Sequence, residues 1–318
     1  MTAKPPARWM ILGAFALVYT IWGSSYIGIH FAIQTLPPFL MTALRFGLAG
    51  VIVVGWAKLR GTPWPTLRQW GYSAVIGFLL FVVNNGGIVW AEGHGIPTGV
   101  AAVLIATLPM WMVLLTWLKP GGTYPGHLVI AGMVIGFIGI IVLAHPEQGV
   151  PLNLLGVVAL LIAAFAWAFG SLYAKSAPLP ESPTMSTGMQ LLCGGALQLV
   201  LSAVTGELPH FNITQVSTTS WLSMLYLAIM SSIIAYSAFV FLMKVSTPAR
   251  VSTYAYVNPV IAVLLGWQLA GEQITLQTVI ATAIIIVGVI LINVAKAKSA
   301  PSPRSMEVRV AEAIPVEV

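Results

Sequence analysis

The 318-residue chain carries 7% charged and 58% hydrophobic residues, no aspartate, and a mean hydropathy of +0.93. Soluble domains carry about 25% charged residues, so this composition excludes a water-soluble protein and predicts a multi-pass integral membrane protein in a lipid bilayer. The formal net charge of +6 lies mostly at the edges of apolar segments and indicates topology, with no nucleic-acid partner, while the lone Cys193 excludes an intramolecular disulfide and a cysteine-based metal site.

Ten apolar stretches reach the roughly 20 residues that a membrane-spanning helix needs. They are residues 9–30, 37–57, 69–91, 97–118, 126–145, 153–174, 185–205, 217–243, 249–270 and 275–295. The sequence therefore predicts an all-α polytopic protein with ten transmembrane helices. The stretch 217–243 is long for one span, and the polar residues 296–318 are expected to form a disordered cytoplasmic tail.

The charges between these stretches orient the chain. If the N-terminus is cytoplasmic, every Lys and Arg outside the spans falls on the inner side. The outer side then receives carboxylates, namely Glu92, Glu147, Glu207 and Glu272. This asymmetry is the positive-inside pattern, so both termini are predicted to be cytoplasmic. Nine or eleven spans would break the alternation.

A proline-centred segment occurs twice. The stretches 109–117 and 259–267 share proline, Val, Leu, Leu and Trp at a constant offset of 150 residues. A proline inside a span frees a carbonyl, which in lipid must lie against protein or a water-filled cavity. Each half holds five spans, so the second half is inverted relative to the first. We therefore expect two inverted repeats, 9–145 and 153–295, around a central cavity, with Pro109 and Pro259 as helix kinks. Two unrelated kinks are the alternative.

Arg45 is the only Lys or Arg that lies away from the ends of the predicted spans. It lies about 12 Å below the outer end of span two, at 1.5 Å rise per residue. A charge at that depth should face the bundle interior or a cavity. The functional interpretation is a guanidinium that attracts a carboxylate or phosphate of the substrate. The alternative is a structural arginine that caps helix carbonyls.

Other polar and aromatic residues are candidates for the cavity wall. Asn84 and Asn85 are adjacent amides in span three, and Tyr254 and Asn258 share a face just before the second proline. Trp111 follows the first proline. Aromatic walls with few polar tips suit amphipathic small molecules. Helix packing by amides and interfacial or core aromatics are the alternatives.

Two carboxylates at outer span ends, Glu92 and Glu272, could take up and release protons during exchange. The alternative is a pair of solvated carboxylates at the interface. The five histidines are scattered without metal-ligand spacing, so no metal and no cofactor is expected. Glycines 132, 136 and 139 in span five allow close helix contact, either within a monomer or in a homodimer.

Several short motifs, taken in order, resemble the EamA family of the drug/metabolite transporter superfamily. They are Trp22-Gly23-Ser24-Ser25-Tyr26, Leu36-Pro37-Pro38-Phe39 and Leu44-Arg45-Phe46 near the start, then Thr253 to Gly266 and Gly271-Glu272 near the end. The likeness extends over about residues 9–295. It implies two EamA domains, a ten-helix fold in the bacterial inner membrane, and most often export of small metabolites or drugs.

The sequence contains no G-x-S-x-G, no H-E-x-x-H and no P-loop, so an enzyme and an ATP-driven pump are not expected. The interpretation is a secondary-active exporter of small amphipathic metabolites or drugs by alternating access, with amino acids or analogues as leading substrates and protons as possible coupling ions. An importer of the same fold is one alternative. A scaffold or receptor-like membrane protein without transport is another.

Overall fold

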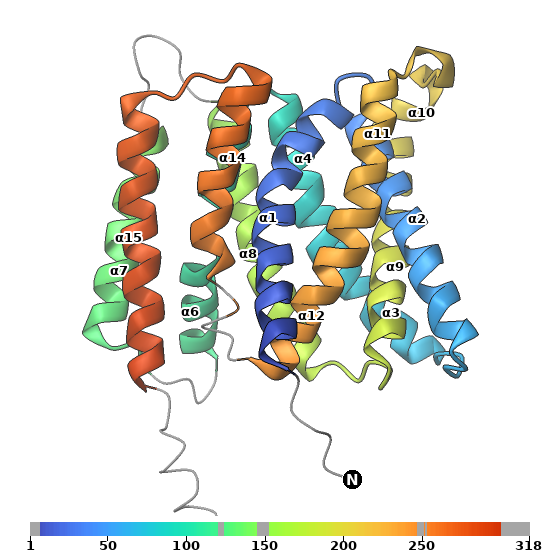
Figure 1. The fold of residues 1–318 in the computed structure, drawn as a ribbon, viewed down its shortest axis with the longest axis horizontal. Helices are drawn as coiled ribbons and strands as arrows, with labels where there is room; N and C mark the ends of the chain where they lie inside the picture. The colour runs from blue at the N-terminus through green and yellow to red at the C-terminus, as the bar shows by residue number, and fades with distance from the viewer. Residues whose placement is uncertain (1–6, 120–123, 145–152, 247–250, 252, 300–318) are drawn as a thin grey trace, which may run out of the picture.

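The computed structural model describes residues 7–119, 124–144, 153–246, 251 and 253–299, and these residues form helices without any strand. The first part of the chain (Figure 1) holds α1 (Arg8–Ala32), α2 (Pro38–Leu59), α3 (Leu67–Gly77), the π-helix η1 (Phe78–Asn85), α4 (Gly86–Gly93), α5 (Thr98–Ile105), α6 (Leu108–Leu118) and α7 (His127–Ala144). The second part holds α8 (Leu154–Ser176), α9 (Pro183–Val204), α10 (Glu207–His210), the 3-10 helix η2 (Ile213–Gln215), α11 (Thr218–Tyr226), the π-helix η3 (Leu227–Ala235), α12 (Tyr236–Val245), α14 (Tyr254–Ala270) and α15 (Leu276–Ser299).

Within the described residues, seven helical segments are long and apolar enough to cross a membrane. They are Arg8–Ala32, Pro38–Leu59, Leu67–Gly93, Thr98–Leu118, Leu154–Ser176, Pro183–Val204 and Thr218–Val245. Three shorter apolar helices cover His127–Val142, Val257–Ala270 and Leu276–Ile292. Because α15 continues to Ser299, residues 296–299 of the expected tail are helical rather than disordered. The rest of that tail lies outside the described residues.

Polar side chains mark where several helices begin. Thr66 and Gln69 form a reciprocal capping box at the start of α3. Asn153 accepts from two backbone amides at the start of α8, and Ser182 caps α9 immediately before Pro183. These local signals place the apolar run of each segment inside a helix, as the lengths of the stretches predict.

Helices from the two parts of the chain pack in pairs. Helix α2 packs along α9, and α7 packs along α15. In Figure 1 these two pairs lie at opposite ends of the molecule, with α1, α8, α14 and α12 between them. Helix α1 contacts α14 and η3, while α8 contacts α5, α6 and η1. Each part of the chain therefore completes its packing only against the other part.

The contact between α7 and α15 requires glycine. A Cβ atom on Gly132 would lie 2.6 Å from the carbonyl oxygen of Gly288. The glycine face of α7 is thus used within the chain, so this face cannot also form a homodimer contact.

Two spans contain a π-helical stretch that the sequence patterns did not indicate. Segment η1 joins α3 to α4, and segment η3 joins α11 to α12. Such stretches are rare and frequently lie at functional sites. The long expected span 217–243 is one helical run in the structure, which extends from Thr218 to Val245 through α11, η3 and α12.

The two prolines behave differently. Pro109 lies at the start of α6, after the helix breaks between Ile105 and Leu108, whereas Pro259 lies inside the continuous helix α14. A proline near a helix start loses no hydrogen bond. The expected pair of kinks is therefore one break and one interior proline.

Candidate functional site

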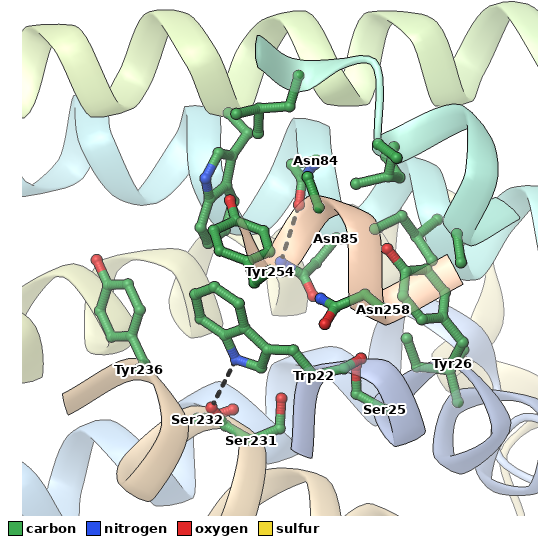
Figure 2. Close-up of a pocket in the computed structure, with 18 of the residues that line it drawn as sticks. Trp22, Ser25, Tyr26, Asn84, Asn85, Ser231, Ser232, Tyr236, Tyr254 and Asn258 are labelled. Carbon is green, nitrogen blue, oxygen red and sulfur yellow. Dashed lines mark hydrogen bonds between the residues drawn. The ribbon is translucent and has the colours of Figure 1, made fainter. Parts of the chain in front are cut away.

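A cavity lies where α1, α2, η1, α8, η3 and α14 meet (Figure 2). The empty space between its lining residues, together with the open solvent at its mouth, amounts to about 760 Å³. Its polar lining comes from both parts of the chain: Ser25, Arg45, Asn84, Asn85, Ser231, Ser232 and Asn258. Its apolar lining includes Trp22, Tyr26, Phe46, Phe81, Ile88, Leu108, Trp167, Tyr236 and Tyr254. Mostly apolar walls with a few convergent polar groups are typical of small-molecule sites.

Trp22 is the centre of the aromatic wall. Its ring lies 5.7 Å from that of Trp167, 5.1 Å from Phe239 and 5.2 Å from Tyr254. The contacts with Trp167 and Tyr254 are edge-to-face, the geometry that aromatic quadrupoles favour. The wall therefore brings side chains of α1, α8, α12 and α14 into contact.

Arg45 lies in the lining and is 4% exposed. Its Nε donates to Ser232 Oγ at 2.9 Å, and its Nη2 donates to Ser231 Oγ at 2.9 Å. The guanidinium also lies 4.7 Å from the ring centroid of Phe46. The third nitrogen, Nη1, has no hydrogen-bond partner among the described residues. This buried cation therefore retains a donor facing no described acceptor.

The two asparagines belong to η1 and lie next to one another in Figure 2. Asn84 donates to the carbonyl oxygen of Ala163 at 2.9 Å. Asn85 donates to the carbonyl oxygen of Leu80 at 3.0 Å and to Asn84 Oδ1 at 3.3 Å. The bond to Ala163 joins η1 to α8, and the bond to Leu80 satisfies a carbonyl within the π-helix.

Asn258 faces the cavity from α14. In the amide orientation that satisfies its surroundings, it donates to the carbonyl oxygens of Tyr254 and Tyr19, at 3.2 Å each. The Tyr19 hydroxyl in turn hydrogen-bonds Thr253. These contacts join α1 to the start of α14, directly before the interior proline Pro259, which also lines the cavity.

Two of the predicted site residues lie outside this lining. Trp111 packs edge-on against Phe137 and Phe165, at 6.2 and 5.6 Å between ring centroids. Pro109 is buried at the start of α6, where its neighbour Leu108 reaches the cavity. The structure thus brings Arg45 and the predicted residues of η1 and α14 together, and it leaves the two predicted residues of α6 outside the lining.

The two carboxylates predicted for proton coupling also lie outside the lining and differ from each other. Glu272 accepts from the backbone amides of Thr98 at 2.7 Å and Gly99 at 3.3 Å, at the first turn of α5. An acid in this position complements the helix dipole. Glu92 is 8% exposed at the end of α4, and neither of its carboxyl oxygens has a hydrogen-bond partner among the described residues. Glu272 therefore has a capping role that Glu92 lacks.

Sequence reasoning did not assign four important lining residues to the cavity: Trp22, Trp167, Ser231 and Ser232. Trp22 begins the motif Trp22-Gly23-Ser24-Ser25-Tyr26 but was not assigned to the cavity, and Trp167 carried no distinguishing pattern among the 11 tryptophans of the chain. The serines did carry one, because adjacent hydroxyls inside an otherwise aliphatic run need partners as the adjacent amides do. No group of three His, Cys, Asp or Glu side chains within the described ranges could hold a metal ion.

Comparisons with known proteins give the chain its relatives. Residues 8–144 and 154–294 each match the EamA-like transporter family. An Escherichia coli K12 protein, "Uncharacterized inner membrane transporter YedA", is 36% identical over 287 residues, covering 90% of this chain and 91% of its own. Another from the same strain, "Probable amino-acid metabolite efflux pump", is 25% identical, covering 87% of this chain and 92% of its own. A crystal structure at 22% identity superposes with a TM-score of 0.62, covering 91% of this chain and 98% of that one, and shows a shared fold.

Proposed function

The chain belongs to the EamA-like transporter family, and from that membership we propose that it is a secondary-active exporter of small amphipathic metabolites or drugs, working by alternating access. Family and named relatives are transporters, which fits a membrane protein that carries small molecules rather than an enzyme. Amino acids or their analogues are the leading substrates of the proposal.

The observation that carries this proposal is the composition of the cavity wall. It combines one cation, three amides and three serine hydroxyls with a surface of aromatic and aliphatic side chains, and both parts of the chain supply it. The polar groups can bind the ionic end of a small molecule, and the aromatic groups can bind its apolar body. In this account Arg45 binds the anionic group, while Asn84, Asn85, Asn258 and Tyr254 bind the rest.

The proposed topology has ten spans, formed by the seven long segments and the three shorter apolar helices, with both termini in the cytoplasm and the protein in the bacterial inner membrane. The halves 9–145 and 153–295 form inverted repeats that rock about the cavity. The pairing of α2 with α9 and of α7 with α15 supports this arrangement, because each pair joins one half to the other.

The coupling step of the proposal uses Glu92 rather than Glu272. A carboxyl that is buried without a hydrogen-bond partner among the described residues is costly when charged. Such a group can bind and release a proton as its surroundings become wet or dry. Glu272, whose oxygens accept two backbone amides, stabilises α5 instead.

The composition of the medium tests the function. Bacteria overproducing the intact protein are compared by untargeted mass spectrometry with bacteria carrying Arg45→Ala at equal membrane abundance. We expect a few small anionic or zwitterionic metabolites to accumulate outside only with the intact protein. Depletion of a metabolite from the medium would show import instead. Identical media from both strains and from cells without the gene would overturn the proposal.

A further inference from the structure

We propose that Ser231 and Ser232 are positioning residues that hold the Arg45 guanidinium as the cavity's anchor for a carboxylate, and that these two hydroxyls set the preference for anionic over neutral cargo. The inference rests on the proposed transport function, and it assigns the class of chemical group that the cavity selects.

The charge balance of the cavity points to an anion. Arg45 is 4% exposed, and the lining residues include no acidic side chain. Its described polar partners are two neutral hydroxyls. A buried charge without a counter-charge is strongly disfavoured, and a charged side chain within a membrane bundle is expected to pair or to face a water-filled path. A carboxylate on the cargo would supply the missing negative charge while it occupies the cavity.

Ser232 is oriented by the backbone of its own π-helix. Its hydroxyl donates to the carbonyl oxygen of Leu227, five residues earlier, at 3.1 Å. A serine hydroxyl has a single proton, so this bond leaves only lone pairs for other partners. The oxygen therefore accepts from Arg45 Nε, at 2.9 Å, without competing for an anion.

Ser231 has a second capacity. Its oxygen accepts from Arg45 Nη2 at 2.9 Å, and its hydroxyl proton is not donated to any acceptor among the described residues. Arg45 Nη1 is likewise without a described partner. The guanidinium Nη1 and the Ser231 hydroxyl are thus two donors, one charged and one neutral, that an acidic group of the cargo could use. Charge-assisted hydrogen bonds of this kind are the stronger class.

The surrounding wall fixes the serine pair and limits the cargo. Trp22 Nε1 donates to the carbonyl oxygen of Ser231 at 3.4 Å, and Figure 2 shows the pair directly beside this indole. Phe46 lies against the guanidinium, and Phe81 lies 4.6 Å from Phe46 between ring centroids. The group next to the carboxylate therefore meets aromatic surface, which favours a monocarboxylate with an apolar body.

The hydroxyls matter because an arginine side chain is long and flexible. Without its two acceptors the guanidinium would lose the orientation in which Nε and Nη2 are held and Nη1 has no described partner, and the ordering of the side chain would oppose binding. The effect of removing the hydroxyls should therefore appear in affinity for the anionic group, with affinity for neutral cargo retained.

The test measures binding of matched probes to the purified full-length protein by equilibrium dialysis. The probe pairs are phenylacetate with phenylacetamide, and hexanoate with hexanamide, which differ mainly in charge. The variants are Ser231→Ala, Ser232→Ala and the double substitution. Ser237→Ala is the matched control, because this serine of α12 is exposed and outside the cavity lining.

We expect the intact protein and the control to bind the carboxylate of at least one pair about tenfold more tightly than its amide. The double variant should lose about tenfold in carboxylate affinity while its amide affinity stays unchanged, and each single variant should lose part of that preference. If the double variant does not fold, the single variants decide the question. Intact protein that binds both members of each pair equally, or binds neither, would overturn the inference.

A preference that survives both single substitutions and the double substitution would also overturn it, while leaving the transport function intact. Failure of the transport function is a separate result, because it is seen in the medium of cells that overproduce the intact protein. Export of neutral metabolites alone, for example, would keep the function and remove the carboxylate anchor.

Discussion

Segments η1 and η3 end at Asn85 and Ala235, 150 residues apart, and each interrupts a membrane-spanning helix beside the cavity. In each, a side chain donates to the carbonyl oxygen five residues earlier: Asn85 to Leu80 at 3.0 Å, and Ser232 to Leu227 at 3.1 Å. The two segments thus use one backbone device. Their outward chemistry differs, because η1 presents neutral amides whereas η3 presents hydroxyls that hold a cation.

The cation has no counterpart in the second half for a steric reason. At the same offset of 150 residues, Gly195 of α9 corresponds to Arg45 of α2. A Cβ atom on Gly195 would lie 2.6 Å from the backbone nitrogen of Gly47, so no side chain fits there. A duplicated backbone has therefore diverged into one charged side and one neutral side. A cargo molecule bound between them would have a preferred orientation.

The largest expected effect comes from removing the positive charge of Arg45, which the serines of η3 hold. Arg45→Met should reduce export of carboxylates about a hundredfold, since loss of a buried charged hydrogen-bond partner costs about 3 kcal/mol. The thermal midpoint should stay the same or rise, because an apolar side chain of similar length replaces a buried cation without a described counter-ion. Export and differential scanning fluorimetry measure the two effects.

A fall of several degrees in the midpoint, with a matching loss of protein from the membrane, would mean that Arg45 is structural. Arg45→Lys provides the control, because it keeps the charge and loses the two-point contact with the serines.

The next largest effect is expected from substituting the two asparagines of η1, the neutral side of the cavity. Asn84→Ala removes the bond to Ala163, and Asn85→Ala removes the bond to Leu80. Each should lower the free energy of unfolding by about 1–2 kcal/mol, the usual cost of an unsatisfied buried partner. Affinity for phenylacetate and phenylacetamide should fall together, about tenfold or less. A fall in affinity for phenylacetate alone, with affinity for phenylacetamide unchanged, would contradict the proposed difference between the two π-helical segments.

A smaller effect should separate the two prolines. Pro259→Ala closes an interior gap in the hydrogen bonding of α14 beside the cavity, and we expect the transport rate to change several-fold with little change in stability. Pro109→Ala lies at a helix start behind the cavity wall and should leave the rate unchanged. Initial rates in proteoliposomes distinguish the two. Equal effects would contradict the difference in their structural settings.

The smallest effect belongs to the capping carboxylates. Glu272→Gln should cost about 0.5–1 kcal/mol of stability and leave transport unchanged, because it weakens the cap of α5 without touching the cavity. Glu207→Gln is the matched control, since Glu207 caps α2 in the same way through Phe39 and Leu40. Thermal unfolding and transport driven by a pH gradient measure both variants. If transport by Glu272→Gln no longer responded to the pH gradient while transport by Glu207→Gln still did, Glu272 rather than Glu92 would be the coupling residue.

Hydropathy and the spacing of charges predicted the helical segments because both follow from the cost of placing polar groups in lipid. The same reasoning identified Arg45, Asn84 and Asn85, because a charge or an amide inside an apolar run needs an explanation. It could not identify η1 and η3, because a π-helix arises from packing that the local pattern does not record. It also placed Trp111 in the cavity wall, whereas Trp111 lies outside the lining in the structure. The helix break after Ile105 decides which face of α6 turns inward, and the sequence pattern does not record that break.

The central claim is that the cavity has one anion-selective side and one neutral side. The most direct measurement is the ratio of phenylacetate to phenylacetamide transport into proteoliposomes of phosphatidylethanolamine and phosphatidylglycerol. It compares the intact protein with Arg45→Met and Asn85→Ala. We predict that Arg45→Met brings the ratio close to one, whereas Asn85→Ala lowers both rates and keeps the ratio. Equal changes of the ratio in both variants, or no change in either, would contradict the claim.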